Sequence, residues 1–301
     1  MVGRTSSIWP HASSRNPVPA VMRRAGVALA ALLGLPAAAA AQGDCFPGAG
    51  SNEARTLALF SVPLTFSPAG APEREPGLRF GIETASIPAV DRVTSTPTIC
   101  RPGKGPENTS LLPVVPRPRL ALPMPGGLGL EVSWIPPVRV GGVRANLFAV
   151  SVGKSVGRPD GIVLALRGHA TFGTVRAPIT CDDDALADSS SECFGGRRSD
   201  DRFRPNLLGA DLTLSFPMAQ GRLRPYAGIG YTRLRPRFQV HFVNRFGELD
   251  QRRVEVDLER VATFGGATWA VTPMLGITGE LYAVPADAVS GRVVVRVSLG
   301  R

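Results

Sequence analysis

The sequence predicts an all-β protein: an antiparallel, up-and-down transmembrane β-barrel of eight to ten strands, with ten preferred. Three observations predict it. An export signal precedes the main domain, long runs alternate between apolar and polar residues, and short turns alternate with longer loops. Alternation with a period of two indicates strands whose two faces meet different surroundings. Outside the signal region, no segment of comparable length has a helical period.

The N-terminal region has the pattern of a signal peptide. Arg23 and Arg24 form a basic region, residues 25–35 are apolar, and residues 39–41 are small residues suited to cleavage. The apolar run is too short for a membrane-spanning helix. We therefore expect export to the bacterial outer membrane through a cleaved signal. The expected parts are an extension with the signal peptide (1–41), a periplasmic segment or first strand (42–76) and the barrel domain (77–301).

The strands follow from runs of alternating residues. Eight runs begin at residue 127, and they span 127–135, 142–153, 161–175, 206–216, 222–238, 252–271, 275–284 and 291–301. Two earlier runs, "TLALFSVPLTF" (56–66) and "GLRFGIETASI" (77–87), raise the number to ten. Residues 88–126 are dense in proline and are expected to be irregular. Ten is preferred over eight, and both satisfy the even number of strands that single-chain bacterial barrels use.

The length of the runs and of their connections favours a membrane barrel over a soluble sheet. Strands of soluble proteins have about 5–6 residues, whereas a tilted strand that crosses a bilayer needs about 9–11. Short turns (217–221, 272–274) alternate with longer loops (176–203, 243–252). This asymmetry is typical of outer-membrane barrels, with tight periplasmic turns and long outer loops. The apolar face is therefore expected to contact lipid and the polar face to line the interior.

Four cysteines follow the predicted signal, and an even number in an exported chain predicts disulfides. Three pairings are possible. The short separation favours Cys181 with Cys193, which leaves Cys45 with Cys100. A zinc site is disfavoured, because the sequence has no CxxC motif and no neighbouring pair of histidines.

The positive charge does not indicate a nucleic-acid partner. The formal charge of the whole chain is +10, but residues 1–41 hold four arginines and no acid, so 30 basic and 24 acidic residues remain. The remaining arginines are scattered along strands, and no basic block with interleaved aromatic residues is present.

Two stretches resemble paired strands of a known class. "FPMAQGRLRPYAGIGYTRL" and "TWAVTPMLGITGELYAV" resemble small bacterial outer-membrane β-barrels of the OmpA/OmpW-like type, and the resemblance covers roughly residues 127–301. It implies a barrel of 8 to 12 strands inserted after export. The implied partners are outer-membrane lipid and the barrel-assembly machinery during biogenesis. The oligomeric state stays open.

Charged residues on the polar face of the runs are the candidate lumen residues. They are either a charged constriction that selects solutes or a network of ion pairs that fills a narrow lumen. The network is favoured, because charges inside a small barrel need partners to offset their desolvation. The candidates are Glu131, Arg167, Asp211, Arg224, Glu255, Asp257, Glu259, Glu280 and Arg296.

The sequence gives no catalytic, cofactor or metal site. His169 and His241 are the histidines after the signal, and Ser215 has no Gly-x-Ser-x-Gly context. The acidic stretch 182–192 lacks the spacing of a calcium-binding loop and is expected to be a cross-linked surface loop. A structural, adhesive or narrow-pore transport role is therefore expected. A soluble barrel that binds a small apolar ligand is the alternative, and a barrel hydrolase is a weaker one.

Overall fold

Ten long antiparallel strands pair in chain order and close into a ring. The ring closes because the last strand, β17, pairs with the first, β2, from Arg292↔Ala85 to Leu299↔Leu78. The computed structural model describes residues 43–72, 77–110, 112–158 and 160–299. The barrel strands are β2 (Leu78–Ser86), β3 (Val114–Met124), β4 (Leu128–Ile135), β6 (Val143–Gly157), β7 (Val163–Ala177), β9 (Leu207–Ser215), β10 (Leu223–Leu234), β15 (Leu258–Ala270), β16 (Leu275–Val284) and β17 (Ala288–Leu299).

The predicted fold class and the preferred number of strands are confirmed, but one strand was assigned to the wrong segment. Residues 56–66 were expected to be a strand, and they instead fall in helix α2 (Asn52–Ser61) and the 3-10 turn η2 (Val62–Leu64). The tenth strand is β3, which lies in the stretch that was expected to be irregular.

Proline made β3 hard to recognise, yet its placement is compatible with pairing to β2. The Ile87 N–H donates to the Pro113 carbonyl, which fixes the direction of the ladder between β2 and β3. Backbone groups alternate in direction along an antiparallel strand, so Pro116 and Pro118 occupy positions whose N–H would face β4. The two prolines therefore remove no backbone hydrogen bond between β3 and β2.

The barrel has two different ends. At one end, which we name the turn end, β3–β4, β6–β7, β9–β10 and β15–β16 are joined by short connections that include η3 (Pro125–Gly127) and η4 (Ala219–Gly221). At the other, the loop end, lie the long connections 87–113, 178–206 and 235–257. The predicted alternation of short turns with long loops is confirmed.

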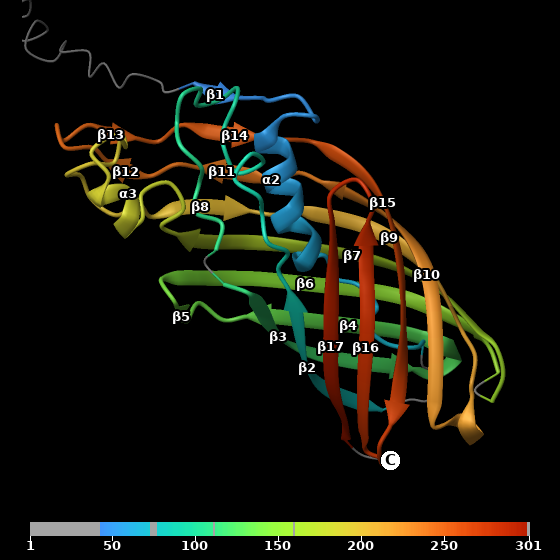
Figure 1. Cartoon of the computed structure of the whole chain (residues 1–301). Coiled ribbons are helices and arrows are strands. Elements are labelled where there is room, and N and C mark those ends of the chain that lie inside the picture. The colour runs from blue at the N-terminus through green and yellow to red at the C-terminus, as the bar shows by residue number, and fades with distance from the viewer. Residues whose placement is uncertain (1–42, 73–76, 111, 159, 300–301) are drawn as a thin grey trace, which may run out of the picture. The chain divides into compact units, whose positions relative to one another are not determined.

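The long loops at the loop end carry secondary structure of their own. Three short strands extend the sheet beside β7 in the order β8, β11, β14, and β1 pairs parallel to β14 (Figure 1). The remaining elements are β1 (Asp44–Cys45), β5 (Arg139–Val140), α3 (Asp183–Ala187), β8 (Asp201–Arg204), β11 (Arg237–Gln239), β12 (Phe242–Val243), β13 (Leu249–Asp250) and β14 (Arg253–Glu255).

The two faces of the barrel strands differ in chemistry. The outward side chains are mostly large and apolar and stay exposed, among them Leu120, Leu166, Leu212, Ile229 and Leu281. Leu281, for example, is 64% exposed, which would cost free energy in water but is favourable against lipid. Because the last strand pairs with the first, the sheet has no free edge strand for the bilayer to meet. The chain is a ten-stranded transmembrane β-barrel.

The N-terminal segment occupies the interior of the barrel. Ser51 begins helix α2 by accepting a hydrogen bond from the Ala54 N–H, and Ala54, Leu57, Ala58 and Ser61 are buried at helical spacing. Figure 1 shows α2 descending from the loop end, beside β1 and β14. Among the described residues, no helix has the length and apolar character needed to span a bilayer.

Candidate functional site

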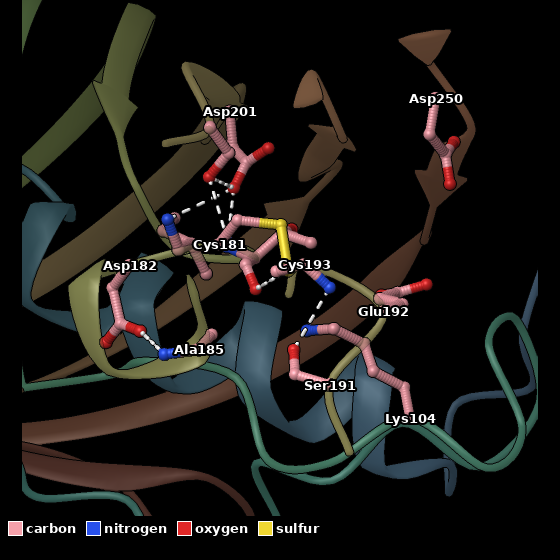
Figure 2. Close-up of a disulfide and its surroundings, with 12 residues drawn as sticks. Lys104, Cys181, Asp182, Ala185, Ser191, Glu192, Cys193, Asp201 and Asp250 are labelled. Atoms are coloured by element: carbon pink, nitrogen blue, oxygen red, sulfur yellow. Dashed lines mark hydrogen bonds between the residues drawn. A yellow bond between two sulfur atoms is a disulfide. The ribbon is translucent and has the colours of Figure 1, made fainter. Parts of the chain in front are cut away.

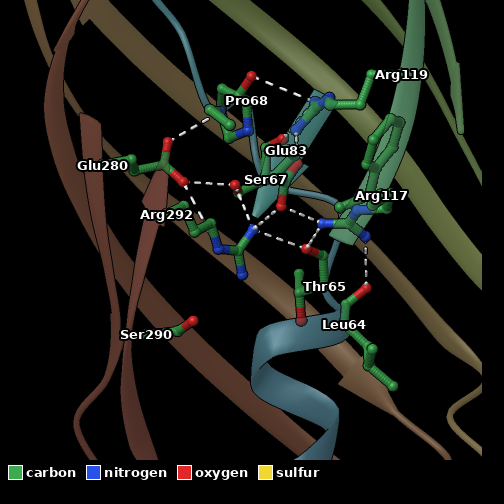
Figure 3. Close-up of polar contacts among 12 residues, drawn as sticks. Leu64, Thr65, Ser67, Pro68, Glu83, Arg117, Arg119, Glu280, Ser290 and Arg292 are labelled. Carbon is green, nitrogen blue, oxygen red and sulfur yellow. Dashed lines mark hydrogen bonds and ion pairs between the residues drawn. The ribbon is translucent and has the colours of Figure 1, made fainter. Parts of the chain in front are cut away.

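The candidate site is the barrel lumen, where the chain after α2 crosses between strands without joining their sheet. We name residues 62–71 the luminal segment. Its backbone is not paired in a sheet ladder, and buried carbonyls that lack enough hydrogen-bond donors cost free energy. Arginines of the wall supply donors. Arg292 donates to the Val62 carbonyl at 3.0 Å. Arg117 donates to the Leu64 carbonyl at 3.2 Å, as Figure 3 shows.

The same pattern continues along the luminal segment. The Arg119 guanidinium donates to the Ser67 carbonyl at 2.9 Å, and Arg167 donates to that carbonyl at 3.1 Å. Arg296 donates to the Pro68 carbonyl at 3.2 Å. Five arginines from three strands, β3, β7 and β17, therefore hold the luminal segment by its backbone, independently of most of its side chains.

Phe66 is the apolar anchor of the luminal segment. Its side chain is fully buried, and the guanidinium carbons of Arg117, Arg119 and Arg167 lie 5.3, 4.3 and 5.6 Å from the ring centre. Cations over an aromatic face are attracted by its negative charge density, and more strongly where water is excluded. The Phe66 side chain therefore anchors the luminal segment, and it packs against three of the arginines that bind the backbone of that segment.

Acidic residues of the wall balance these arginines. Glu83 is fully buried and pairs with Arg117 (2.5 Å) and Arg119, and Arg292 lies 3.9 Å from it. Two guanidinium groups on one carboxylate give the geometry in which buried charges are best satisfied. Figure 3 shows Glu83 at the centre of this group, beside the luminal segment.

A second set of ion pairs lies closer to the turn end. Glu131 binds Arg119 at 2.8 Å, and it lies 3.7 Å from Arg167 and 3.6 Å from Arg296. Asp211 pairs with Arg167 at 2.9 Å. Each arginine thus serves an acid of the wall and a carbonyl of the luminal segment together.

Glu280 binds the luminal segment directly. Its carboxylate accepts hydrogen bonds from the Ser67 hydroxyl (2.5 Å), the Ala69 N–H (2.9 Å) and the Tyr226 hydroxyl (3.0 Å). Arg292 also donates to the Ser67 hydroxyl. Glu280 is therefore the acid that recognises donors of the segment, where the arginines recognise its acceptors.

Several of the residues expected in the lumen lie together there, namely Glu131, Arg167, Asp211, Glu280 and Arg296. Arg224 is half-buried on β10, opposite Thr268 near the turn end. Sequence reasoning missed Glu83, Arg117, Arg119 and Arg292. Glu83 stood on the polar side of its run and was visible in the sequence, whereas Arg117 and Arg119 lie in the unrecognised strand β3.

Glu255, Asp257 and Glu259 do not line the lumen, so this prediction is wrong. They lie on the outer face, and the inward positions of the same run are Val254, Val256 and Leu258, which are buried in an apolar core. This stretch is at the loop end, where the inner face meets packed apolar side chains, so the polar side chains of the run point outwards. On the outer face, Arg237 pairs with Glu255 and Asp257, both at 3.0 Å.

The residues considered for catalysis are not arranged as a catalytic group. His169 is opposite Gly209 on β9, whereas Ser215 is opposite Val163. At 3.3 Å per residue, six positions separate His169 from Ser215 by about 20 Å. His169 and Asp211 approach to 3.7 Å inside the ion network. Within the described residues, no cluster of three or more histidine, cysteine or acidic side chains is arranged to hold a metal ion.

Both predicted disulfides, Cys45–Cys100 and Cys181–Cys193, are confirmed. Figure 2 shows the Cys181–Cys193 disulfide beside Asp201. The Asp201 carboxylate accepts a hydrogen bond from the Thr180 N–H at 2.6 Å, which fixes the backbone next to Cys181. The acidic stretch 182–192 has structural roles. Asp182, for instance, caps α3 by accepting from the Ala185 N–H at 2.8 Å.

Comparison with known proteins gives similarity of structure only. No family model matches the sequence, and a search of curated proteins finds no match. Similar solved structures include the attachment invasion locus protein Ail of Yersinia pestis (TM-score 0.30, 10% identity, 74% of this chain, 98% of that chain). CymD, a monoaromatic hydrocarbon channel, is another (TM-score 0.35, 13%, 78% and 69%), and so is the KdgM porin (TM-score 0.30, 10%, 74% and 99%).

These proteins have different roles by their names, and similarity at this level says nothing of what this chain binds. The barrel assignment rests on the closed strand pairing and the apolar outer face described above. By these two features, the chain is a closed membrane-spanning β-barrel.

Proposed function

We propose that this outer-membrane barrel is not an open pore, and that it acts at its loop end as a non-catalytic surface protein. The observation that carries the proposal is the luminal segment, whose carbonyls are held by five arginines while four acids of the wall balance the charge. A ten-stranded barrel is narrow, so the luminal segment together with the side chains that bind it blocks the lumen.

The loop end is built to present a fixed surface, which supports a binding or adhesive role there. Four short strands continue the sheet beyond the barrel, and two disulfides brace the loops around them. Such bracing restricts the loops that would otherwise be the most mobile parts of the protein.

Planar-bilayer conductance tests the closure of the lumen. The wild-type protein is expected to give no steady conductance. A variant in which residues 62–68 are replaced by a Gly-Ser linker of equal length is expected to conduct. A preference for anions is expected, because the five arginines that bind the luminal segment outnumber the four acids that balance them. The control is the same kind of replacement in the exposed turn 244–248, which should stay closed. Steady conductance of the wild type would contradict the proposal.

The proposal also includes the route of export. The signal pattern in residues 1–41 supports cleavage before residue 42, and these residues lie outside the described part of the chain. Outer-membrane lipid and the barrel-assembly machinery are the partners that this route requires. N-terminal sequencing of the protein from purified outer membranes tests it, and a mature chain that begins at residue 1 would contradict it.

A further inference from the structure

The wall of the barrel has a gap in its pairing between β3 and β4. Their ladder ends at Arg119↔Ser133, although β3 begins at Val114 and β4 continues to Ile135. Both strands remain paired on their other sides, to β2 and β6. We name this interval, residues 114–118 against 134–136, the seam.

Proline accounts for the seam. If the register continued, Pro118 would face Trp134, and Pro116 would face Pro136. These are the positions whose N–H would have pointed across to the neighbouring strand, and proline has none to give. The seam is therefore encoded by the sequence and does not arise from a loose loop.

A cavity of about 650 Å³ opens behind the seam, and its lining is almost wholly apolar. Its inner wall comes from Leu57 and Phe60 of α2 and from Ala145, Leu147 and Phe203 of the barrel and loop end. The volume lies in the range of about 300–1,000 Å³ that is usual for small-molecule sites. The cavity lies on the loop-end side of the luminal segment, which supplies Leu64 to its floor.

The outer wall of the same cavity belongs to the lipid-facing surface. Phe80 and Ile82 line it from β2, and they are 42% and 52% exposed on the outer face of the barrel. Val138, which follows the seam on the β4 side, also lines the cavity and is exposed. One apolar space therefore reaches from the interior through the seam to the surface that contacts lipid.

The charged groups in the lining of the cavity are already paired with other protein groups, and this pairing favours a ligand without charge. The Glu53 carboxylate accepts backbone N–H bonds from residues 98–100, and Arg117 pairs with Glu83. Arg101 pairs with Glu192 and lies 3.6 Å from Glu107. A charged ligand would have to break these pairs, so the lining suits a neutral one.

We propose that this cavity binds a neutral, apolar molecule that partitions into lipid, and that the molecule passes between the cavity and the outer leaflet through the seam. The cavity is several times larger than the engineered site of about 150 Å³ that holds benzene. It therefore fits a molecule with several rings or a long hydrocarbon chain. The proposal goes beyond closure of the lumen, and its test measures binding whereas the test of closure measures conductance.

The test uses the neutral fluorophore N-phenyl-1-naphthylamine and the tryptophans of the chain, with the protein reconstituted in phosphatidylcholine vesicles. Trp134 is at the seam and Trp269 lies near the turn end, opposite Ile277. After cleavage before residue 42, the mature chain holds two tryptophans, Trp134 and Trp269. Two reporters are compared: one retains Trp134 alone, with Trp269→Phe, and the other retains Trp269 alone, with Trp134→Phe. Saturable quenching of Trp134 near one probe per protein, with weak linear quenching of Trp269, is expected. Equal linear quenching of both would show partitioning into lipid only and would overturn the site.

Substitutions then separate the cavity from the seam, in the reporter that retains Trp134. Ala145→Phe fills the cavity and is expected to lower the affinity at least about tenfold, a change of roughly 1.4 kcal/mol. Ala227→Phe on the lipid face is the matched control and should leave the affinity unchanged. Unchanged binding by a folded Ala145→Phe protein would overturn the cavity as the site.

Restoring the missing N–H groups tests the route. The triple variant Pro116→Val, Pro118→Val and Pro136→Val is expected to extend the ladder and slow uptake of the probe from vesicles several-fold, with the affinity retained. Pro123→Val, in the same strand but outside the seam, serves as control. An unchanged rate in a triple variant that keeps its heat-dependent gel mobility would overturn passage through the seam.

Discussion

At the scale of single residues, the lumen is organised by arginines that bind the backbone of the luminal segment and by acids of the wall that neutralise those arginines. Glu83 is the clearest case, because it lies fully buried among Arg117, Arg119 and Arg292. Its pairs cannot exchange with water, so their loss is not compensated by solvation. The position of a glutamate in the barrel, and not its residue type, therefore decides how much it contributes to the stability of the protein.

Glu83→Gln is accordingly expected to destabilise the barrel by about 3–5 kcal/mol, the usual cost of removing one partner of a buried ion pair. Glu259→Gln is the matched control. Glu259 lies on the exposed outer face at the loop end, where ion pairs contribute little. The measurement is the temperature at which the folded band disappears in gels of gradually heated samples. Equal temperatures for the two variants would argue against a buried network.

At the scale of elements, the sequence was sufficient for the strands that have regular alternation and insufficient for two segments. In β3, Pro116 and Pro118 suggested a loop because their lost hydrogen bonds are visible in the sequence, whereas the one-sided pairing that tolerates them is not. In α2, the burial of Ala54, Leu57 and Ala58 has helical spacing, and Ser51 offered a cap. The contiguous apolar run after them obscured that pattern.

The position of the luminal segment could not be derived from the sequence, because nothing in a short apolar run specifies that arginines as far as 53 and 230 residues away will bind its carbonyls. The inner charges of β4, β7 and β16 could be derived, since alternation alone assigns their face. Alternation failed for Glu255 and Asp257 because the interior at the loop end is packed with apolar side chains, so the polar side of that run points outwards.

Helix α2 is joined to the loop 87–113 by Glu53. Burial raises the pKa of this carboxyl, but N–H bonds from Ile99, Cys100 and Thr98 outweigh it and lower the pKa below its usual value of 4.5. A lowered folded-state pKa gives stability that is present above the ordinary pKa and is lost as the pH falls through the folded-state pKa.

Comparison of the wild type with Glu53→Gln across pH tests this link. The wild type is expected to be the more stable at pH 7, and the difference should shrink as the pH falls below about 4.5, the ordinary pKa of the group. The readout is protease cleavage within residues 88–110. A difference that stays constant from pH 7 to pH 3 would show that the charge of Glu53 is not what holds the loop.

At the scale of the whole molecule, the two disulfides have unequal roles. Cys45–Cys100 spans 55 residues and joins the start of the N-terminal segment to an outer loop, whereas Cys181–Cys193 spans 12 within one loop. By loop-closure entropy the first is worth about 4 kcal/mol and the second about 3 kcal/mol.

Replacing both cysteines of a pair by serine is therefore expected to cost more stability for Cys45 and Cys100 than for Cys181 and Cys193. Only the first pair of substitutions should also give transient conductance events, because it frees the chain that leads into the lumen. Thermal denaturation and bilayer recordings of the two double variants provide the comparison. Conductance events in the Cys181 and Cys193 variant alone would contradict this assignment.

The course of the N-terminal segment also constrains how the lumen can ever open. The chain is anchored by Cys45–Cys100 at the loop end and becomes a wall strand, β2, at the turn end. The segment is thus tethered at both ends of the barrel, so it cannot leave the lumen in either direction while the disulfide and the closed ring of strands are intact. During folding, therefore, either the barrel closes around a segment that is already inside it, or the Cys45–Cys100 disulfide forms after the segment has entered the lumen.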